Sequence, residues 1–310
     1  MKFFRLLLLT ITCFSELTAQ DKVKYRDLVF ESSTRKKNIY YGEPGAGRPK
    51  AYLMDIYNPE GDSSLNRPVI VLMHGGGFKL GSKSNSRMKI WGRRFARMGY
   101  VCVSINYRLS KKKPLSRFND LVEGCLEATE DAGIAVGYLK RNHLNLGIDT
   151  SKIIMAGHSA GAMIALQIVY SSPAEMLHLI KPAIAVAAKP EHNREEIAAV
   201  VNFWGAIYDT TWLANARVPI VSVHGSKDRV VPINFDDTPM FGSAAIHREA
   251  TRLSIPNVLK IYEGKGHELQ RHFNPLYAGS VARKRWREAA DFASSFLYET
   301  LYIKTVAHTR

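Results

Sequence analysis

The chain has 310 residues, of which 46% are hydrophobic and 23% charged. This balance excludes disorder, a collagen-like repeat and a small disulfide-built fold, and no apolar run reaches the roughly 18 residues that a spanning helix needs. The net charge of +15 could attract nucleic acid, but the Lys and Arg residues are spread along the chain without a nucleic-acid-reading motif. We therefore expect no nucleic-acid partner.

The first 19 residues are predicted to be a signal peptide. Lys2 and Arg5 give a positive start, an apolar stretch runs from Leu6 to Phe14, and a plausible cleavage site ends at Ala19. We therefore expect a secreted or periplasmic protein, with residues 20–310 as the mature chain and no integral membrane segment. A buried N-terminal helix is an alternative interpretation.

The three cysteines are too few and too scattered for a zinc ribbon or an iron–sulfur site. Cys13 lies in the signal segment, where lipidation is a minority alternative. Cys102 and Cys125 could form one disulfide in an oxidising compartment. Cys102 lies inside an apolar strand and Cys125 on an apolar helical stripe, which favours two core thiols.

The rest of the chain alternates predicted strands and helices. Two antiparallel edge strands are expected first, over Val23–Ser32 and Ala51–Tyr57. From residue 68 onward, short continuous apolar runs alternate with segments of helical period, which is typical of a parallel sheet covered by helices on both faces. The predicted strands are Val69–Met73, Val101–Asn106, Ile153–Ala156, Ala199–Phe203, Pro219–Val223 and Val258–Tyr262.

Three long helices are predicted between and after these strands. Met88, Trp91, Phe95 and Met98 follow at steps of three, four and three, a second stripe runs from Leu121 to Leu139, and the last helix covers about Val281 to Leu301. Ser171–Glu196 and Arg229–Gly242 are expected to form loops or short helices. No repeat or linker interrupts the pattern, so residues 20–310 are predicted to form a single domain.

A strand, Ile153–Ala156, runs directly into Gly157-His158-Ser159-Ala160-Gly161 and then into a helix-like segment. This G-x-S-x-G motif presents a serine on a sharp strand-to-helix turn, where glycines let strand and helix approach each other. The amide of Ala160 then lies at a helix N-terminus, which favours a developing anion. Ser159 is therefore the candidate nucleophile.

A second motif, His74-Gly75-Gly76-Gly77-Phe78, follows the strand Val69–Met73. Consecutive glycines leave backbone amides unshielded, and in a hydrolase such amides can stabilise a carbonyl oxygen as it becomes an oxyanion. Alone, the run could also be a phosphate-binding loop or only a turn.

Together, the strand–His-Gly-Gly-Gly and strand–Gly-His-Ser-Ala-Gly–helix motifs resemble the α/β-hydrolase superfamily, most of all its His-Gly-Gly-Gly carboxylesterases and lipases. The likeness covers roughly residues 50 to 300. It implies the α/β-hydrolase fold with a mostly parallel central sheet of about eight strands, helices on both faces and no large cap domain. It also implies oxyanion-hole amides from Gly76, Gly77 and Ala160, and no cofactor.

The same resemblance implies the chain order nucleophile, acid, histidine. Asp228 follows the strand Pro219–Val223 and His267 follows the final strand, so both are expected at the carboxyl edge of the sheet. Asp209 is a rival for the acid. His267 and His272 are five residues apart, and this spacing turns them away from each other on a helix, so no metal is expected.

Aromatic residues on predicted loops could line a substrate pocket, although core packing is equally consistent with their sequence. Phe78 and Trp204 are the pocket candidates, with Trp212, Met240 and Phe241 near the same edge. His158 stands where neighbouring subgroups of the superfamily have Asp or Glu, and this difference leaves the substrate range open. In this respect the sequence resembles the compact bacterial esterases.

The sequence thus predicts a secreted serine carboxylesterase that hydrolyses short-chain esters through an acyl-enzyme. The expected partner is a small-molecule or polymer-borne ester. Alternatives within the fold are an acetyl or feruloyl carbohydrate esterase, a polyester hydrolase, a peptidase of the prolyl-oligopeptidase type and a non-catalytic binding protein.

Overall fold

The computed structural model describes residues 21–42, 47, 49–185, 197–235, 240–274 and 277–303. The predicted signal peptide, with Cys13, lies outside the described residues and stays a prediction. Within the described ranges, no helix is long and apolar enough to cross a membrane.

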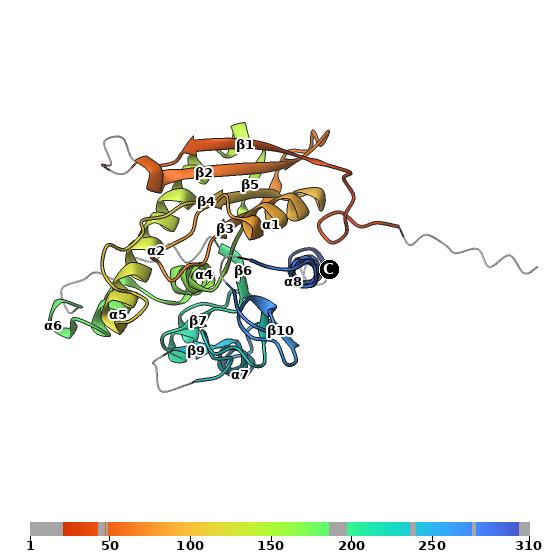
Figure 1. The fold of residues 1–310 in the computed structure, drawn as a ribbon. Coiled ribbons are helices and arrows are strands. Elements are labelled where there is room, and N and C mark those ends of the chain that lie inside the picture. Colours follow the sequence, from red (N-terminus) through yellow and green to blue (C-terminus); the bar gives the residue numbers. More distant parts are fainter. Residues whose placement is uncertain are drawn as a thin grey trace, which may run out of the picture.

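An eight-stranded sheet forms the centre of the molecule, as the sequence predicted (Figure 1). Six neighbouring strands run parallel, and the two strands nearest the N-terminus are antiparallel to their neighbours. The strands, in their order across the sheet, are β1 (Ser33–Tyr40), β2 (Leu53–Pro59), β4 (Val101–Ile105), β3 (Arg67–Met73), β5 (Ile148–His158), β6 (Ile197–Phe203), β8 (Ile220–Gly225) and β10 (Asn257–Tyr262).

Two strand predictions need correction. Val23–Ser32 is not a strand, because the amides of Tyr25, Val29 and Phe30 donate hydrogen bonds to the carbonyls of Met98 and Arg97 instead of pairing with the sheet. The true edge strand is β1, whose charged sequence fits a position with much of its surface in solvent. β10 was predicted to be covered on both faces, but it forms the opposite edge and is only half-buried.

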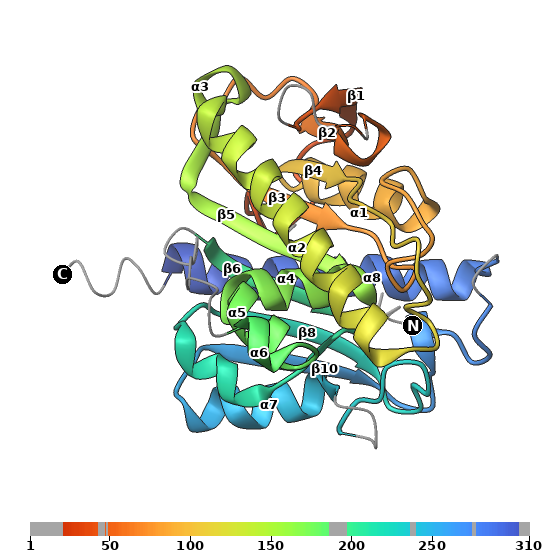
Figure 2. The ribbon, with the colours of Figure 1, turned by 90° about the vertical axis from the view of Figure 1, so that its left-hand side faces the viewer.

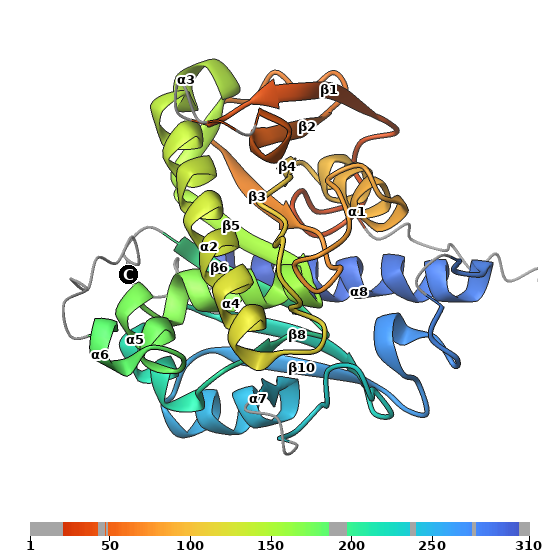
Figure 3. The same ribbon diagram turned by 60° about the vertical axis from the view of Figure 1, so that its left-hand side comes forward.

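Helices cover both faces of the sheet (Figures 2 and 3). On one face, α2, α4 and α7 pack in one hydrophobic cluster with the strands, and on the other α1 and α8 pack in a second cluster. A second, two-stranded antiparallel sheet is formed by β7 (Ala206–Ile207) and β9 (Phe241–Gly242). The helices are α1 (Ser86–Arg97), α2 (Phe118–Arg141), α3 (His143–Leu146), α4 (Ala160–Tyr170), α5 (Pro173–His178), α6 (Pro182–Ala185), α7 (Ser243–Arg252) and α8 (Ser280–Tyr298).

The core residues follow from the sequence pattern. Met88, Trp91 and Phe95 are fully buried along one side of α1, and Asn85 caps that helix by accepting a hydrogen bond from the amide of Met88. Cys102 and Cys125 are both buried and both free thiols. At the carboxyl edge of the sheet, the loops after β3 and β8 therefore follow strands whose residues are buried in the core.

Candidate active site

Ser159 sits on the sharp turn between β5 and α4. Its backbone has φ 53° and ψ −124°, a conformation that non-glycine residues rarely adopt because it strains the backbone. Two glycines make the turn possible. A Cβ on Gly157 would lie 2.3 Å from the Gly161 backbone, and a Cβ on Gly161 would lie 2.1 Å from the carbonyl oxygen of Met73. The motif thus folds as the sequence predicts, with the serine at the end of a buried strand.

The structure brings Ser159, His267 and Asp228 into one hydrogen-bonded chain. His267 Nε2 lies 3.0 Å from Ser159 Oγ, and His267 Nδ1 lies 2.8 Å from Asp228 Oδ2. All three residues are at least nine-tenths buried. Such a sequence of hydroxyl, imidazole and carboxylate can remove a proton from the serine as it attacks an electrophile.

Asp228 is held as a carboxylate in the turn after β8. Its Oδ1 accepts hydrogen bonds from the amides of Val230 and Val231, and His224 Nε2 lies 3.5 Å from its Oδ2. Burial raises the pKa of Asp228, but the contacts with His224 and His267 outweigh burial and hold this pKa well below its usual range. Asp228 therefore stays charged beside His267 at neutral pH.

The glycine loop after β3 takes a backbone shape that requires glycine. Gly76 has φ 122° and Gly77 φ 57°, and a Cβ on Gly76 would lie 2.2 Å from the carbonyl oxygen of Leu80. Within the described residues, the amides of Gly76 and Gly77 donate no hydrogen bond. These two donors are therefore free for a ligand oxygen.

Two buried histidines, His74 and His158, support this loop, and the sequence did not reveal the contact that His158 makes with it. The His74 ring stacks on Tyr107 at 4.3 Å, and burial lowers the His74 pKa to about 4. The His158 Nε2 accepts a hydrogen bond of 2.9 Å from the Gly75 amide. No sequence pattern could reveal the hydrogen bond between Gly75 and His158, because these residues are 83 positions apart in the chain.

The rival acid does not reach the histidine. Asp209 accepts hydrogen bonds from the amide and hydroxyl of Thr211, where it caps a short 3-10 helix, Thr210–Asn215. Asp228 occupies the position beside His267 instead. Asp236 and Asp237, two further acidic residues after β8 in the chain, lie outside the described residues.

The pocket predictions for Phe78 and Trp204 need correction. Both side chains are fully buried in the hydrophobic core, so neither offers a surface to a substrate in this structure. Trp212 is also buried, whereas Met240 and Phe241 are partly exposed. Phe273 adds an aromatic side chain that the sequence did not single out: its ring meets the His267 imidazole edge-on at 5.0 Å and is 40% exposed.

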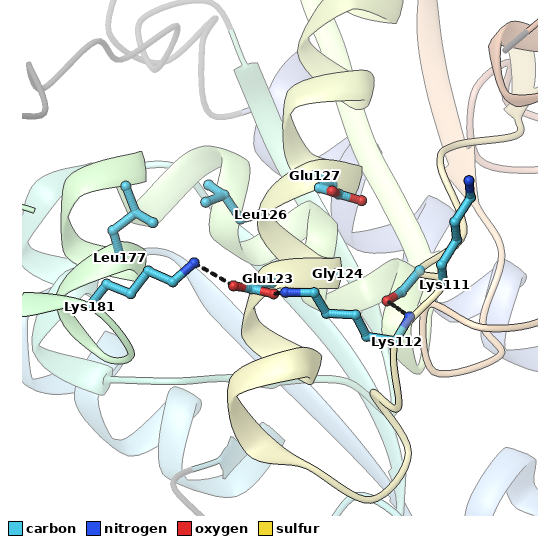
Figure 4. Close-up of a pocket in the computed structure, with 9 residues that line it drawn as sticks. Lys111, Lys112, Glu123, Gly124, Leu126, Glu127, Leu177 and Lys181 are labelled. Atoms are coloured by element: carbon cyan, nitrogen blue, oxygen red, sulfur yellow. Dashed lines mark hydrogen bonds and ion pairs between the residues drawn. The ribbon is translucent and has the colours of Figure 1, made fainter. Parts of the chain in front are cut away.

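A cavity of about 400 Å³ lies between the loop at Ser110, helix α2 and helix α5 (Figure 4). Lys112 and Lys181 both point to Glu123 across it, and their hydrogen bonds hold the pKa of Glu123 below its usual value. None of the three hydrogen-bonded residues of the site lines this cavity. It adjoins the glycine loop, because the Ser110 amide donates to the Phe78 carbonyl.

The described residues contain no group of three or more His, Cys, Asp and Glu side chains that could hold a metal ion. His267 and His272, the pair weighed from the sequence, do not share a helix, since the turn at His267 spans only three residues, His267–Leu269.

Two curated proteins are similar to part of this chain. Gut esterase 1 of Caenorhabditis elegans is 30% identical over 118 residues, which is 38% of this chain and 20% of that protein. A probable isoprenylcysteine alpha-carbonyl methylesterase of Oryza sativa subsp. japonica is 29% identical over 157 residues, 51% of this chain and 33% of that protein. The chain thus spans a third or less of the length of these curated relatives.

Solved structures share the fold. Thermogutta terrifontis esterase 2, in a form phosphoramylated by tabun, superposes with a TM-score of 0.57 at 19% identity, covering 86% of this chain and 94% of that one. The architecture is therefore the α/β-hydrolase fold. A family model described as BD-FAE matches residues 54–215, the segment that carries both the glycine loop and Ser159. Because this match covers more than half of the 310 residues, the chain belongs to the BD-FAE family.

Proposed function

We propose that this protein is a serine carboxylesterase that uses Ser159, His267 and Asp228 as its catalytic triad. The single observation that carries the proposal is the hydrogen-bonded chain from Ser159 Oγ through the His267 imidazole to Asp228 Oδ2. The strained backbone at Ser159 and the free amides of the neighbouring glycine loop support it.

In the acylation step, Ser159 Oγ attacks the ester carbonyl carbon while His267 Nε2 takes the hydroxyl proton. Asp228 holds the imidazole with its proton on Nδ1 and stabilises the positive charge that forms on the ring. The carbonyl oxygen becomes an oxyanion, which the amides of Gly76, Gly77 and Ala160 stabilise. Collapse of this intermediate expels the alcohol, which takes the proton from His267 Nε2.

In the deacylation step, His267 acts again as the base. It removes a proton from a water molecule, which attacks the acyl carbon on Ser159 and passes through a second oxyanion in the same hole. Release of the acid returns the proton to Ser159 Oγ. Both steps need the same two features. One is a base within hydrogen-bond reach of the attacking oxygen, and the other is a set of backbone amides that can donate hydrogen bonds to the oxyanion.

Three observations support an ester of a short acid as the substrate. Gut esterase 1 and the isoprenylcysteine methylesterase are both named as esterases, the chain belongs to the BD-FAE family, and no segment of the sequence resembles a mobile apolar lid for a lipid surface. Acetylated or feruloylated carbohydrates and polyesters carry the same bond and are alternatives. Export through residues 1–19 belongs to the same proposal, and N-terminal sequencing of exported protein would find cleavage near Ala19.

Hydrolysis of p-nitrophenyl esters with two to twelve acyl carbons tests the proposal, with Ser159→Ala as the comparison. We expect turnover by the wild type, a preference for the shorter acids and loss of most activity in the variant. Methyl ferulate, acetylated xylan and a soluble polyester, measured in parallel, separate the alternatives. Equal rates for the two proteins on every ester would contradict the proposal.

A further inference from the structure

His158, the residue before Ser159, lies fully inside the protein at the point where three parts of the candidate site meet. It is 2% exposed, and its ring lies among Trp91, Trp204 and the glycine loop. Burial, with smaller contributions from the nearby Arg87, His74 and His267, lowers its pKa well below the usual value. The ring is therefore neutral at physiological pH.

The hydrogen bonds of His158 determine which ring nitrogen carries the proton. Nε2 accepts from the Gly75 amide at 2.9 Å, so Nε2 must be unprotonated and Nδ1 must hold the proton. The Gly75 amide has no other acceptor within the described residues. Losing the acceptor on His158 would leave a buried donor without a partner, which proteins avoid.

The contact between the ring and the loop is tight as well as polar. A Cβ on Gly75 would lie 2.7 Å from His158 Cε1 and 2.8 Å from its Nδ1. The bare backbone of Gly75 thus lies directly against the imidazole. The next two residues along the chain are Gly76 and Gly77, whose amides are the proposed oxyanion donors.

The Nδ1 atom of the ring also faces the segment that carries His267. His158 Nδ1 lies 3.9 Å from Glu268 Oε1, and Glu268 directly follows His267 with φ 56°. Arg87 of α1 forms an ion pair with Glu268, and the Trp286 indole of α8 donates to the Glu268 carbonyl at 2.8 Å. His158 Nδ1 makes no hydrogen bond within the described residues, and the negative charge of Glu268 at 3.9 Å favours a proton on this nitrogen, which leaves Nε2 free to accept from Gly75.

Resting on the proposed function, we infer that His158 is a positioning residue for the oxyanion hole: its Nε2 holds Gly75 and thereby keeps the amides of Gly76 and Gly77 in front of Ser159. It touches no reacting atom. Its effect passes through the backbone of the glycine loop. Because His158 is the last residue of β5 and directly precedes Ser159, it holds the glycine loop against the strand that carries the nucleophile.

The test compares His158→Phe with His158→Gln. Phenylalanine keeps an aromatic ring but has no acceptor, whereas the glutamine Oε1 is as many bonds from the backbone as the histidine Nε2 and can accept from Gly75. We expect His158→Phe to lower kcat roughly 10- to 1000-fold with little change in KM, because misplaced oxyanion donors weaken only the transition state. His158→Gln should recover most of that loss.

Two further measurements separate positioning from folding. His247→Phe is the matched control, because His247 is also a buried histidine, on α7, bonded to Asn257 and not to the loop; it should lower the melting temperature without changing kcat per folded chain. Hydrogen exchange of the Gly75 amide should be slow in the wild type and His158→Gln, and fast in His158→Phe. If His158→Phe does not fold, His158→Asn, whose acceptor is too short to reach, takes its place.

The outcomes distinguish the inference from the function on which it rests. Two results would overturn the inference while the esterase proposal stands, provided that Ser159→Ala is inactive. The first is that His158→Phe keeps kcat within a factor of three of wild type. The second is that His158→Phe and His158→Gln lose kcat equally. If the wild type is no faster than Ser159→Ala, the esterase proposal fails. Unchanged exchange at Gly75 in His158→Phe would still overturn the positioning role in that case.

Discussion

Ser159 and His267 are 108 residues apart in the chain, yet Ser159 Oγ lies 3.0 Å from His267 Nε2. Parallel strands create this closeness, because β5 and β10 both end at the same edge of the sheet.

Of the two candidate acids, Asp228 and Asp209, only Asp228 should be needed for activity. Asp228→Asn leaves the His267 Nδ1 proton without a charged acceptor, and we expect kcat to fall by roughly 10⁴-fold. Asp209→Asn should have no such effect, since Asp209 only caps a short helix and asparagine caps equally well. Steady-state kinetics of the two variants decide this, and a larger loss for Asp209→Asn would move the acid to that position.

The serine turn should tolerate no side chain at Gly161. In Gly161→Ala the new Cβ would meet the Met73 carbonyl oxygen at 2.1 Å, so β3 and the glycine loop must shift. We expect a loss of about 1–3 kcal/mol in the free energy of unfolding, and reduced kcat. Gly133→Ala in α2 is the control: its Cβ meets nothing within 4 Å, so it should gain about 0.5–1 kcal/mol. Urea unfolding of both measures the difference, and equal stabilities would show that the turn can relax.

The sequence predicted the serine turn and the residues around it because their signals are local. The strand, the two glycines and the helix of the serine turn lie next to one another in the sequence. Asp228 and His267 each follow a recognisable strand. The His158–Gly75 contact and the burial of Phe78 and Trp204 depend on how distant segments pack, which no local pattern encodes. Val23–Ser32 was mistaken for a strand for the same reason: its backbone partners are at the end of α1, not in the sheet.

Asp55 should be a strong stabiliser because it neutralises buried cations. It is fully buried and bonds to Lys83 at 2.6 Å and to Arg35, so burial raises its pKa but these partners lower it below its usual value. Asp55→Ala leaves Lys83, only 4% exposed, without a counter-charge, which should cost about 3–5 kcal/mol. Glu249→Ala breaks an exposed pair with Arg252 and should change the urea midpoint little. Similar midpoints for both variants would contradict this assignment.

Buried His247 should make stability fall in mild acid. Burial lowers its folded-state pKa from 6.5 to about 4, despite a hydrogen bond to Asn257. A group with a lowered folded pKa contributes stability above its unfolded pKa of about 6.5, and this is lost as the pH falls toward 4. About 2.5 pH units at 1.36 kcal/mol each give roughly 3 kcal/mol.

The difference between wild type and His247→Asn isolates that contribution, because asparagine can still donate to Asn257 without titrating. Urea unfolding at pH 8, 6, 5 and 4 should show the wild type losing stability relative to the variant as the pH falls. Parallel pH profiles for the two proteins would contradict the prediction, because they would mean that the His247 pKa is the same in the folded and unfolded states.

Covalent labelling of Ser159 tests the central claim most directly. An aryl phosphonate ester that traps activated serines should add one phosphonyl group per chain, found by mass spectrometry on the peptide that contains Ser159. Ser159→Ala should stay unlabelled, and His267→Ala should label far more slowly because the base is missing. Labelling of the wild type at another residue, or equal labelling of Ser159→Ala, would contradict the account.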